Sequence, residues 1–595
     1  MASSIPFDVQ YFVEKSRNNK YEWLVFLITI ILLILHGILF HWIPIYLRSK
    51  RTENSLNNPG YFKFLKTWDI WTSCIKLEIP GTKKSIYFQP SVVLLGALFL
   101  VINAVFCFVE TVDLDYLPRY YVVSKRISKV AVGSLPTIML AIMKNDLLTS
   151  ISGLQHDRIT FLHLWLGRIM WTMITIHFIM ACKYWLGLDF VIMILIPPQI
   201  FGMMAYCSFF LLTWASLKFI RNLSFDVFLL QHRVLSFIML LMTFFHNSGN
   251  RAAVLIAVHS VVLDRVTSNI ISFVHKRKSP TKGMCSFEVL DEDTMSIDIP
   301  IHEAGYTTSA WYTIFLPRVS CWKPGQHIYL CVPKVNRFQF HPFTIASLEE
   351  SGNMKLLVRK QKGFTKRLMT KLKKMEEVEM SNFEDNDGEV ENREMGIHKL
   401  KVTFTGPYGA NHQNFLRFDS VLFLAAGSGG AFVFPVALAL LKEIDLRNSK
   451  SDFLHRPMNP KIKLIWSIQK KENIRWFVDQ LQQILQLSNS INLSVTIYIT
   501  QEVEEEVDDE KLMDILYHSS SSHNRTHSDV SIEFVFKRAD VATLIQKQSM
   551  KLNQSQALAV CSCGSPSFTN SIKIHCNSAR KANDSPDIYC YTESF

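Results

Sequence analysis

Apolar residues dominate the chain before residue 275, where long runs without a charged side chain follow one another. Trp23–Leu47, Pro90–Val109 and Phe190–Leu217 contain no Asp, Glu, Lys or Arg, and each is long enough to cross the roughly 30 Å hydrocarbon layer of a membrane. Four further apolar runs are shorter or carry a few charges: Val130–Met143, Thr160–Leu186, Asp226–Ser248 and Ala252–Val274. The pattern predicts seven membrane-spanning helices in residues 23–274, after a short polar segment, residues 1–22.

Lys and Arg residues in the short loops indicate how these spans are oriented. They gather between the first and second spans, between the fifth and sixth, and directly after the seventh, at His275–Lys278. Because basic short loops lie on the cytosolic side, residues 1–22 are expected outside the cytosol and residues from 275 onward inside it. A loop on the opposite side carries Glu110, Asp113 and Asp115, which either attract cations or form an ordinary solvated surface.

The pattern changes to short alternating strands after Gly283, such as Cys285–Leu290 and His327–Val332. From Ser420 it changes again, to a strand at Val421–Ala425, a glycine-rich turn, a helix and a further strand at Lys463–Ile468. This order predicts a β-barrel-like domain over residues 275–415 and an α/β domain over residues 416–595. Two acidic inserts, residues 376–394 and 502–529, are expected to be solvated, disordered loops.

Composition narrows the function classes. A hydrophobic content of 49% and a mean hydropathy of +0.14 exclude a wholly soluble protein. The net charge of +12 follows from the basic loops, and no Lys/Arg tract with interleaved aromatic residues indicates a nucleic-acid partner. Eleven cysteines at irregular spacing do not indicate a disulfide framework.

Four histidines in two of the spans share one spacing. His163 and His177 lie in the fourth span, His232 and His246 lie in the sixth, and 14 residues separate the two members of each set. A step of 14 residues returns to nearly the same helix face about 21 Å further along the axis. Because the two spans run parallel, His163 faces the level of His232 and His177 that of His246. Each pair is therefore a candidate for two axial ligands of a haem iron.

The simpler alternative is that intramembrane histidines form hydrogen bonds between helices. Two matched pairs make that alternative weaker, since ionisable groups are rare inside membranes. Arg168 and Arg233 lie close to the predicted cytosolic ends, where a guanidinium group pairs with a haem propionate or extends to the interface. An iron with two axial histidines has no open coordination position, which suits electron transfer.

The second half of the chain carries motifs typical of dinucleotide binding. Gly363-Phe364-Thr365 opens a predicted helix whose free amides suit a pyrophosphate. Gly427, Gly429 and Gly430 lie between a strand and a helix, where glycine allows close backbone approach to a dinucleotide. Three further motifs accompany them: His341-Pro342-Phe343-Thr344-Ile345-Ala346-Ser347, Gly406-Pro407-Tyr408-Gly409 and Cys563-Gly564-Ser565-Pro566.

Together these motifs resemble the ferric reductase and NADPH oxidase superfamily, and short fungal metalloreductase-like proteins in particular. The resemblance runs from the third span to the end of the chain. It implies a six-helix core that holds two haem b groups, with the first span as an addition. It also implies a cytosolic ferredoxin-reductase-like module for FAD and NADPH.

The resemblance also implies roles for single residues. His341 would approach the FAD pyrophosphate, Phe343 the flavin ring and Thr344 its redox-active edge. Cys563 would lie near the nicotinamide, and Phe595 would cover the flavin until nicotinamide displaces it, unless the terminus is frayed. The remaining implied cofactor contacts are Pro342, Ile345, Ala346, Ser347, Gly363, Thr365, Gly406, Gly409, Gly427, Gly429, Gly430 and Gly564.

Two departures from the family pattern concern the nucleotide. Three positions after Trp466 the family usually has Arg, a partner for the 2′-phosphate, whereas this chain has Gln469. Lys470, Lys471 or Arg475 is expected to supply that charge, which leaves NADPH against NADH open. The glycine-rich turn is followed by Ala431-Phe432, where a small residue and Ile are usual.

The expected function is transfer of electrons from cytosolic NADPH through FAD and two haems to an acceptor across the membrane. Ferric or cupric ions or their chelates are the favoured acceptor. A superoxide-forming oxidase, with dioxygen as acceptor, and an inactive membrane regulator are the alternatives. The sequence does not distinguish the plasma membrane from the endoplasmic reticulum, and it indicates no protein partner.

Overall fold

The computed structural model describes most of the chain as two compact units. The described residues are 6–53, 59–78, 80, 85–143, 147–154, 156–278, 283–301, 322–337, 339–384, 397–410, 412–449, 460–487, 491–502, 532–582 and 585–594. One unit, the membrane unit, comprises Met1–Ile43 and Ser91–Ser268, and the other, the nucleotide unit, comprises Pro44–Pro90 and Asn269–Phe595. Each unit is described separately below.

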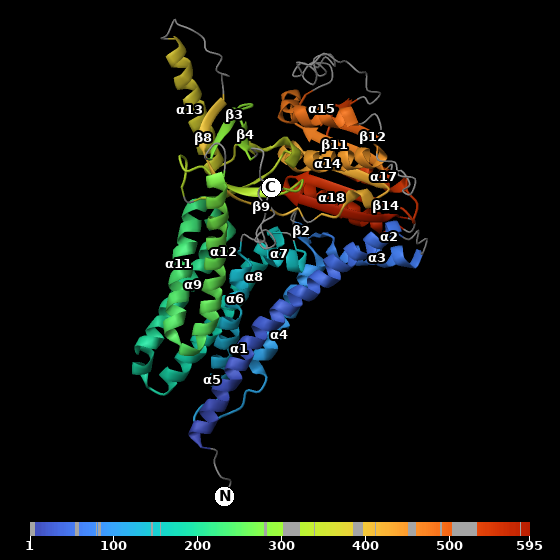
Figure 1. The fold of residues 1–595 in the computed structure, drawn as a ribbon. Coiled ribbons are helices and arrows are strands. Elements are labelled where there is room, and N and C mark those ends of the chain that lie inside the picture. The colour runs from blue at the N-terminus through green and yellow to red at the C-terminus, as the bar shows by residue number, and fades with distance from the viewer. Residues whose placement is uncertain are drawn as a thin grey trace. The chain divides into compact units, whose positions relative to one another are not determined.

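The membrane unit is built from helices (Figure 1). Its first helix, α1, spans Phe7–Gly37 and is extended by a π-helical turn at Ile38–Trp42. The other helices are α4 (Pro90–Phe108), α5 (Arg119–Gly133), α6 (Leu135–Leu140), α7 (Leu147–Ser152), α8 (His156–Gly187), α9 (Pro197–Ala215), α10 (Lys218–Leu223), α11 (Phe225–His246) and α12 (Arg251–Lys278). Its main buried core is formed by apolar side chains from α1, α4, α5, α6, α8, α9, α11 and α12.

Five stretches of helix in the described part of the chain are long and apolar enough to cross a membrane. They are Phe7–Ser49, Pro90–Phe108, Arg158–Gly187, Phe225–His246 and Ser248–Ile270. In the third predicted span the helix breaks at Ser134 into α5 and α6, and the fifth contains α9. The number of seven spans therefore stays a prediction.

The first helix begins well before the apolar run that predicted it. α1 starts at Phe7, and its polar residues Glu14, Asn18 and Glu22 are buried on one face. Arg126 of α5 donates to Asn18 at 2.5 Å, and Lys129 of α5 donates to Glu22 at 2.9 Å. A polar sequence thus continues the helix because a cationic neighbour satisfies its buried face.

The nucleotide unit contains two antiparallel sheets that form the predicted β-barrel-like domain. One has the strand order β7-β4-β3-β8 and the other β6-β5-β9. Their bounds are β3 Met284–Val289, β4 Thr294–Pro300, β5 His327–Cys331, β6 His341–Thr344, β7 Asn353–Arg359, β8 Ile397–Lys401 and β9 Thr403–Tyr408. Buried side chains from both sheets form one hydrophobic core, and helix α13 (Phe364–Glu384) adds Phe364, Leu368 and Leu372 to it.

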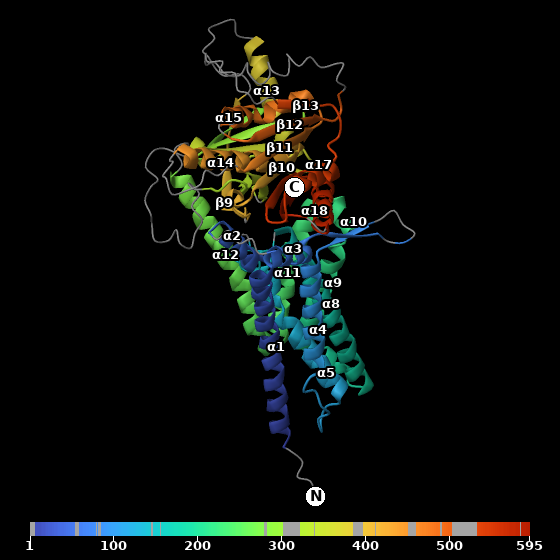
Figure 2. The same cartoon turned by 90° about the vertical axis from the view of Figure 1, so that its right-hand side faces the viewer.

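A six-stranded parallel sheet forms the α/β domain, with the order β13-β12-β11-β10-β14-β15. Figure 2 labels its strands β10 to β13. Its strands are β10 Ser420–Ala426, β11 Lys461–Ile468, β12 Leu493–Ile499, β13 Ile532–Val535, β14 Ala557–Gly564 and β15 Asp587–Ser594. Its helices are α14 (Gly430–Ser449), α15 (Val478–Leu487), α17 (Val541–Met550) and α18 (Pro566–Arg580). The predicted strands at Val421–Ala425 and Lys463–Ile468 are confirmed.

One predicted loop is partly wrong. Residues Glu376–Glu384, assigned to the acidic insert 376–394, form the end of helix α13. Strong helix formers such as Met375, Glu376 and Glu377 continue the helix, so the acidic composition alone did not indicate a loop. The rest of that insert, and residues 503–529 of the other, lie outside the described residues.

The loop between the first and second predicted spans belongs to the nucleotide unit, which differs from the predicted domain boundaries. This loop contains α2 (Ile43–Glu53), α3 (Pro59–Thr72) and a hairpin of β1 (Ile75–Glu78) and β2 (Ser85–Phe88). Two of the basic residues in this loop, Arg48 and Lys66, also bind β15 and the end of α18 within the same unit.

Candidate functional site

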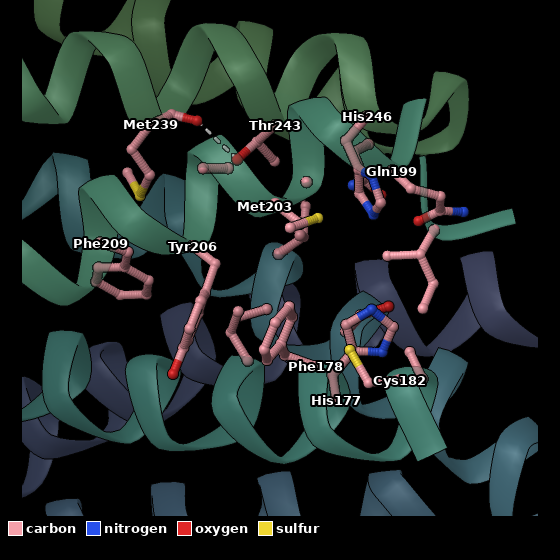
Figure 3. A pocket seen from close by; sticks show the side chains of 18 of the residues that line it. His177, Phe178, Cys182, Gln199, Met203, Tyr206, Phe209, Met239, Thr243 and His246 are labelled. Carbon is pink, nitrogen blue, oxygen red and sulfur yellow. Dashed lines mark hydrogen bonds between the residues drawn. The ribbon is translucent and has the colours of Figure 1, made fainter. Parts of the chain in front are cut away.

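His177 and His246 face the same cavity in the membrane unit (Figure 3). His177 lies on α8 and His246 ends α11. The cavity holds about 840 Å³ of empty space, including its open mouth, and has a mostly apolar lining. The structure thus brings together the pair predicted from the 14-residue spacing.

In each histidine of this pair, the ring nitrogen Nδ1 is engaged in a hydrogen bond. His177 Nδ1 donates to the carbonyl of Ser124 at 2.9 Å, and His246 Nδ1 donates to the carbonyl of Pro198 at 2.7 Å. Because a carbonyl only accepts, Nδ1 carries the proton and Nε2 keeps its lone pair. A metal-binding histidine needs this tautomer, so the pair fits two axial haem ligands.

A glycine makes room for the His246 ring. A methyl group at Gly202 on α9 would lie 2.6 Å from both Cε1 and Nδ1 of His246. The ring therefore lies directly against the backbone of α9, and the Pro198 carbonyl fixes its rotation. The sequence analysis missed Gly202, because a glycine within an apolar helix gives no signal of what packs on it.

His163 and His232 form the second pair. Their ring centres are 6.3 Å apart and their planes are inclined by 65°. Two bonds of about 2 Å from nitrogen to a metal leave room for an iron between rings at this distance. His163 Nδ1 donates to the carbonyl of Ile138 at 3.1 Å, whereas His232 Nδ1 is buried and has no hydrogen-bond partner among the described residues. The pair thus fits the predicted second haem.

The two arginines predicted near the propionates differ in environment. Arg168 stacks its guanidinium group over the Trp165 ring at 5.2 Å, while Arg233 is exposed. Their propionate contacts stay a prediction. Among the described residues, no group of three His, Cys, Asp or Glu could hold a metal ion.

The predicted flavin residues lie on strand β6 and its continuation. The His341 ring stacks on Phe364 of α13, with centres 4.3 Å apart, and Phe343 lies 6.5 Å from the same ring. Thr344 is nearly buried and pairs in register with His327 of β5. His341, Pro342 and Phe343 keep part of their surface exposed, so they remain candidates for cofactor contact.

Ile345, Ala346 and Ser347 have structural partners instead. Ile345 and Ala346 are buried, and their amides donate to the carbonyls of Gln326 and Lys355. The Ser347 hydroxyl donates to the carbonyl of Asn353 at 2.7 Å and accepts from the amide of Lys355 at 3.0 Å. Backbone amides and the Ser347 hydroxyl thus connect this segment to β7 and to Gln326, and the predicted contact of these three residues with FAD is not supported by their burial.

Glycines at the predicted pyrophosphate turn have backbone angles that favour glycine. Gly363 has φ +79° and precedes α13, whose first turn is closed by the Thr365 hydroxyl accepting from the amide of Gln361 at 2.8 Å. Gly406 and Gly409 have φ +127° and +80° and shape the end of β9. A side chain at any of these positions would be strained.

The glycine-rich turn and the Cys563 loop lie in contact. A methyl group at Gly429 would overlap the Cys563 carbonyl and lie 3.0 Å from the Gly564 amide. Trp466 of β11 supports the turn by donating from its indole to the Gly427 carbonyl at 3.0 Å. The two loops predicted at one edge of the parallel sheet are thus together, where α/β proteins bind ligands.

Burial raises the pKa of the Cys563 thiol well above its ordinary value, and the Glu593 carboxylate raises it further. The thiol therefore stays protonated at neutral pH and is no thiolate nucleophile. A neutral thiol suits its predicted place beside a nicotinamide, where hydride moves and a thiolate would add a charge.

Arg359 is a cation at the nucleotide site that the sequence analysis missed. It ends β7 of the barrel domain, yet its Nη2 donates to Gln469 Oε1 at 3.3 Å. Its Nη1 lies 4.0 Å from the position that a Cβ atom at residue 427 would occupy. Lys470, Lys471 and Arg475, predicted for this charge, lie at or after the end of β11. No motif indicated Arg359, since only the fold brings it there.

The unusual Phe432 does not fill the glycine-rich turn. It is buried in the core under α14, stacked on Tyr591 with centres 6.0 Å apart, and Gly325 leaves room for its ring. The departure from the family pattern is therefore accommodated by packing. Phe595, predicted to cover the flavin, lies outside the described residues.

Three family models match successive parts of the chain. Residues 127–243 match a ferric reductase like transmembrane component, residues 289–412 an FAD-binding domain, and residues 418–577 a ferric reductase NAD binding domain. The chain thus contains a membrane-embedded part, followed by an FAD-binding domain and an NAD-binding domain. Its homologues are fungal ferric reductases and NADPH oxidases, as predicted from the motifs.

Three relatives illustrate the range. A probable cell surface ferric reductase of Aspergillus oryzae is 25% identical over 60% of this chain and 45% of its own length. Ferric/cupric reductase transmembrane component 2 of Schizosaccharomyces pombe is 24% identical over 76% of this chain and 77% of that protein. A superoxide-generating NADPH oxidase subunit of Dictyostelium discoideum is 25% identical over 46% of this chain and 37% of its own length.

Proposed function

We propose that the protein transfers electrons from cytosolic NADPH to ferric or cupric ions on the opposite side of the membrane. The observation that carries this proposal is the two histidine pairs, each on α8 and α11, three of whose four rings direct Nδ1 to a backbone carbonyl. Two haems held in this way accept and release electrons without binding oxygen at iron.

FAD, when bound, converts the two-electron donor NADPH into a source of single electrons. The chain's own residues position the reactants. His341 and Phe343 are proposed to contact FAD, and Gly427, Gly429 and the Cys563 loop to bind the nicotinamide nucleotide. Arg359, with Lys470 and Lys471, supplies positive charge for the 2′-phosphate that NADPH has and NADH lacks, which favours NADPH.

A metal acceptor is favoured because ferric and cupric reductases are named among the relatives that cover most of this chain. The acidic loop predicted to attract cations gives no independent support. Asp113 accepts from the Arg119 amide at 2.6 Å, Glu110 pairs with Lys20 at 3.4 Å, and Asp115 accepts from Gln10 at 2.5 Å. The second candidate, a superoxide-forming oxidase, is supported by the Dictyostelium relative.

Proteoliposomes test the two candidates together. Protein loaded with FAD and haem is supplied with NADPH on the side of the nucleotide unit, and ferrous chelate and superoxide are measured inside, with and without superoxide dismutase. Direct metal reduction predicts ferrous chelate that forms without oxygen and resists the dismutase. Ferrous chelate that requires oxygen and disappears with dismutase would identify an oxidase, and no electron transfer at all would identify an inactive regulator.

The membrane in which the protein works is a separate question. We propose a plasma-membrane location, because the Aspergillus relative is named a cell surface protein. Immunofluorescence of the tagged chain against plasma-membrane and endoplasmic-reticulum markers tests this, and staining confined to the reticulum would contradict it.

A further inference from the structure

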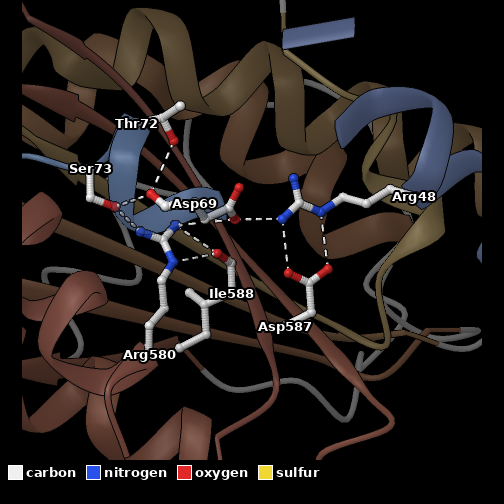
Figure 4. Close-up of polar contacts among 7 residues, drawn as sticks. All are labelled: Arg48, Asp69, Thr72, Ser73, Arg580, Asp587 and Ile588. Carbon is white, nitrogen blue, oxygen red and sulfur yellow. Dashed lines mark hydrogen bonds and ion pairs between the residues drawn. The ribbon is translucent and has the colours of Figure 1, made fainter. Parts of the chain in front are cut away.

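The loop between the first two predicted spans places charged residues inside the nucleotide-binding domain. Arg48 of α2 and Asp69 of α3 are 3% and 6% exposed. Their partners Arg580 of α18 and Asp587 of β15 are 3% and 1% exposed. Two cations and two carboxylates therefore form one buried cluster, in which formal charges balance (Figure 4).

Arg48 makes the central contact of this cluster. Its Nε and Nη2 donate to the two carboxylate oxygens of Asp587 at 3.0 and 2.8 Å, and Nη2 also donates to Asp69 at 2.5 Å. The guanidinium group lies 5.4 Å from the Tyr589 ring centre. Such two-pronged pairing is specific for the planar guanidinium group and fixes direction as well as distance.

Arg580 makes a second connection, in the opposite direction. It donates from Nε and Nη2 to the carbonyl of Ile588 at 2.9 and 2.6 Å, and from Nη1 to the Ser73 hydroxyl. Lys66 of α3 donates to the carbonyl of Ala582 at 2.5 Å. The loop thus binds both β15, the last strand of the sheet, and the end of the helix before it.

A cluster of this kind specifies geometry more than it adds stability. Removing water from four charges has a large cost that good hydrogen bonds only balance, and loss of one partner leaves another charge buried without compensation. Arg48 therefore favours one docked position of the loop over all others. An apolar contact would permit sliding along the strand.

We propose that residues Pro44–Pro90 form a docking arm, anchored by Arg48 on Asp587, that restrains the nucleotide-binding domain for electron delivery to the membrane unit. The chain passes between the two units at three points, 43/44, 90/91 and 268/269, and the arm joins two of them. A domain held by three connections samples fewer orientations than one held by a single linker. Arg48 is thus a positioning residue, and this proposal rests on the proposed electron transfer.

The test uses the full-length protein and three readouts. Hydrogen exchange of β15 and α3 amides, measured without added cofactors, reports docking. Anaerobic haem reduction by NADPH reports electron delivery, and NADPH oxidation by an artificial flavin-level acceptor reports the nucleotide and flavin sites alone. The variants are Arg48→Gln, the milder Arg48→Lys and the exchanged pair Arg48→Asp/Asp587→Arg. Lys442→Gln, which removes an exposed pair with Glu350 in the same unit, is the matched control.

Arg48→Gln is expected to speed exchange in β15 and α3 by about tenfold and to slow haem reduction similarly, with artificial-acceptor activity within about twofold of the unsubstituted protein. Arg48→Lys should give exchange and haem-reduction rates between those of Arg48→Gln and the unsubstituted protein. The exchanged pair should recover part of both rates, and Lys442→Gln should change neither.

Unchanged exchange in Arg48→Gln, or an equal fall of both activities in Arg48→Gln and Arg48→Lys, would overturn the docking arm. If the unsubstituted protein reduces no haem, the proposed function fails. The electron-delivery half of the present proposal then fails with it, while the exchange data still decide whether the arm docks.

Discussion

Single backbone carbonyls decide which nitrogen of three histidines is left for a metal. The carbonyls of Ile138, Ser124 and Pro198 each accept from an Nδ1. None of the three is distinctive in sequence, so the 14-residue spacing predicted the histidines but not their orientation. The four proposed ligands were thus predicted from the sequence, whereas the carbonyls that orient them became visible only in the fold.

Gly202→Ala is expected to remove the haem that we propose between His177 and His246. The added methyl group occupies space used by the His246 ring, so the ring must turn away from the cavity. The absorbance of reduced haem per protein should fall by about half, since one of two haems is lost.

Gly167→Ala on α8 is the control for this substitution, because no described atom lies within 4 Å of the added group. Full haem content in Gly202→Ala would show that the His246 ring does not need this position.

Gly429→Ala is expected to weaken nucleotide binding. The methyl group would force the glycine-rich turn away from the Cys563 carbonyl, which separates the two loops of the candidate site. The KM for NADPH should rise by about tenfold or more, equivalent to about 1.4 kcal/mol, with a smaller change in kcat.

Steady-state kinetics with an artificial acceptor measure this effect, with Ser428→Ala in the same turn as the control. An unchanged KM in Gly429→Ala would place the nucleotide elsewhere.

The Cys563 thiol is expected to resist alkylation. Its raised pKa means that the reactive thiolate forms only as the pH rises far above neutrality. At about pH 8, iodoacetamide should modify Cys563 at less than about a tenth of its rate in the urea-unfolded protein. Peptide mass spectrometry follows the modification, and equal rates in the two states would contradict a buried, protonated thiol.

At the scale of elements, α1 and α5 are held together by charges that the sequence assigned to other roles. Glu22 lies in the segment predicted as a polar terminus and Lys129 directly precedes the predicted span Val130–Met143, yet they pair at 2.9 Å in a buried position. Hydropathy locates apolar runs but does not predict which polar residues will face each other. This is why the start of α1 and the break between α5 and α6 were not predicted.

Glu22→Gln is expected to destabilise the membrane unit by about 3 kcal/mol, because it leaves the Lys129 ammonium buried without an opposite charge. The free energy of unfolding in mixed micelles, followed by helix content, measures the effect. Glu110→Gln breaks the exposed pair with Lys20 and should change stability by less than about 1 kcal/mol. Equal losses in the two variants would show that burial of the Glu22 pair does not matter.

The strands of the nucleotide unit were more predictable than the helices of the membrane unit. Alternating or continuous apolar runs between glycine-rich turns located β3, β5, β10 and β11 to within about two residues. The order of β10 to β15 across the sheet and the approach of Arg359 to Gln469 depend on contacts between residues far apart in the sequence. No local sequence pattern predicts such contacts.

At the scale of the molecule, the sequence correctly predicted the order of a membrane domain, an FAD-binding domain and an NAD-binding domain. The domain boundaries predicted from the sequence were wrong for residues 44–90. A topology rule counts the positive charge of Arg48 in the same way whether the side chain faces water or Asp587. The rule predicts the side of the membrane on which the loop lies, whereas only the fold shows that Arg48 binds Asp587.

The distance in sequence between Arg48 and Asp587 also constrains how the protein is made. During synthesis the arm emerges from the ribosome more than 500 residues before the strand it binds, so it must wait, with Arg48 and Asp69 solvated, until the sheet is complete. Docking is therefore among the last events of folding. A ribosome stalled before β15 would leave a chain with inserted helices and an unattached arm, which quality-control proteases can recognise.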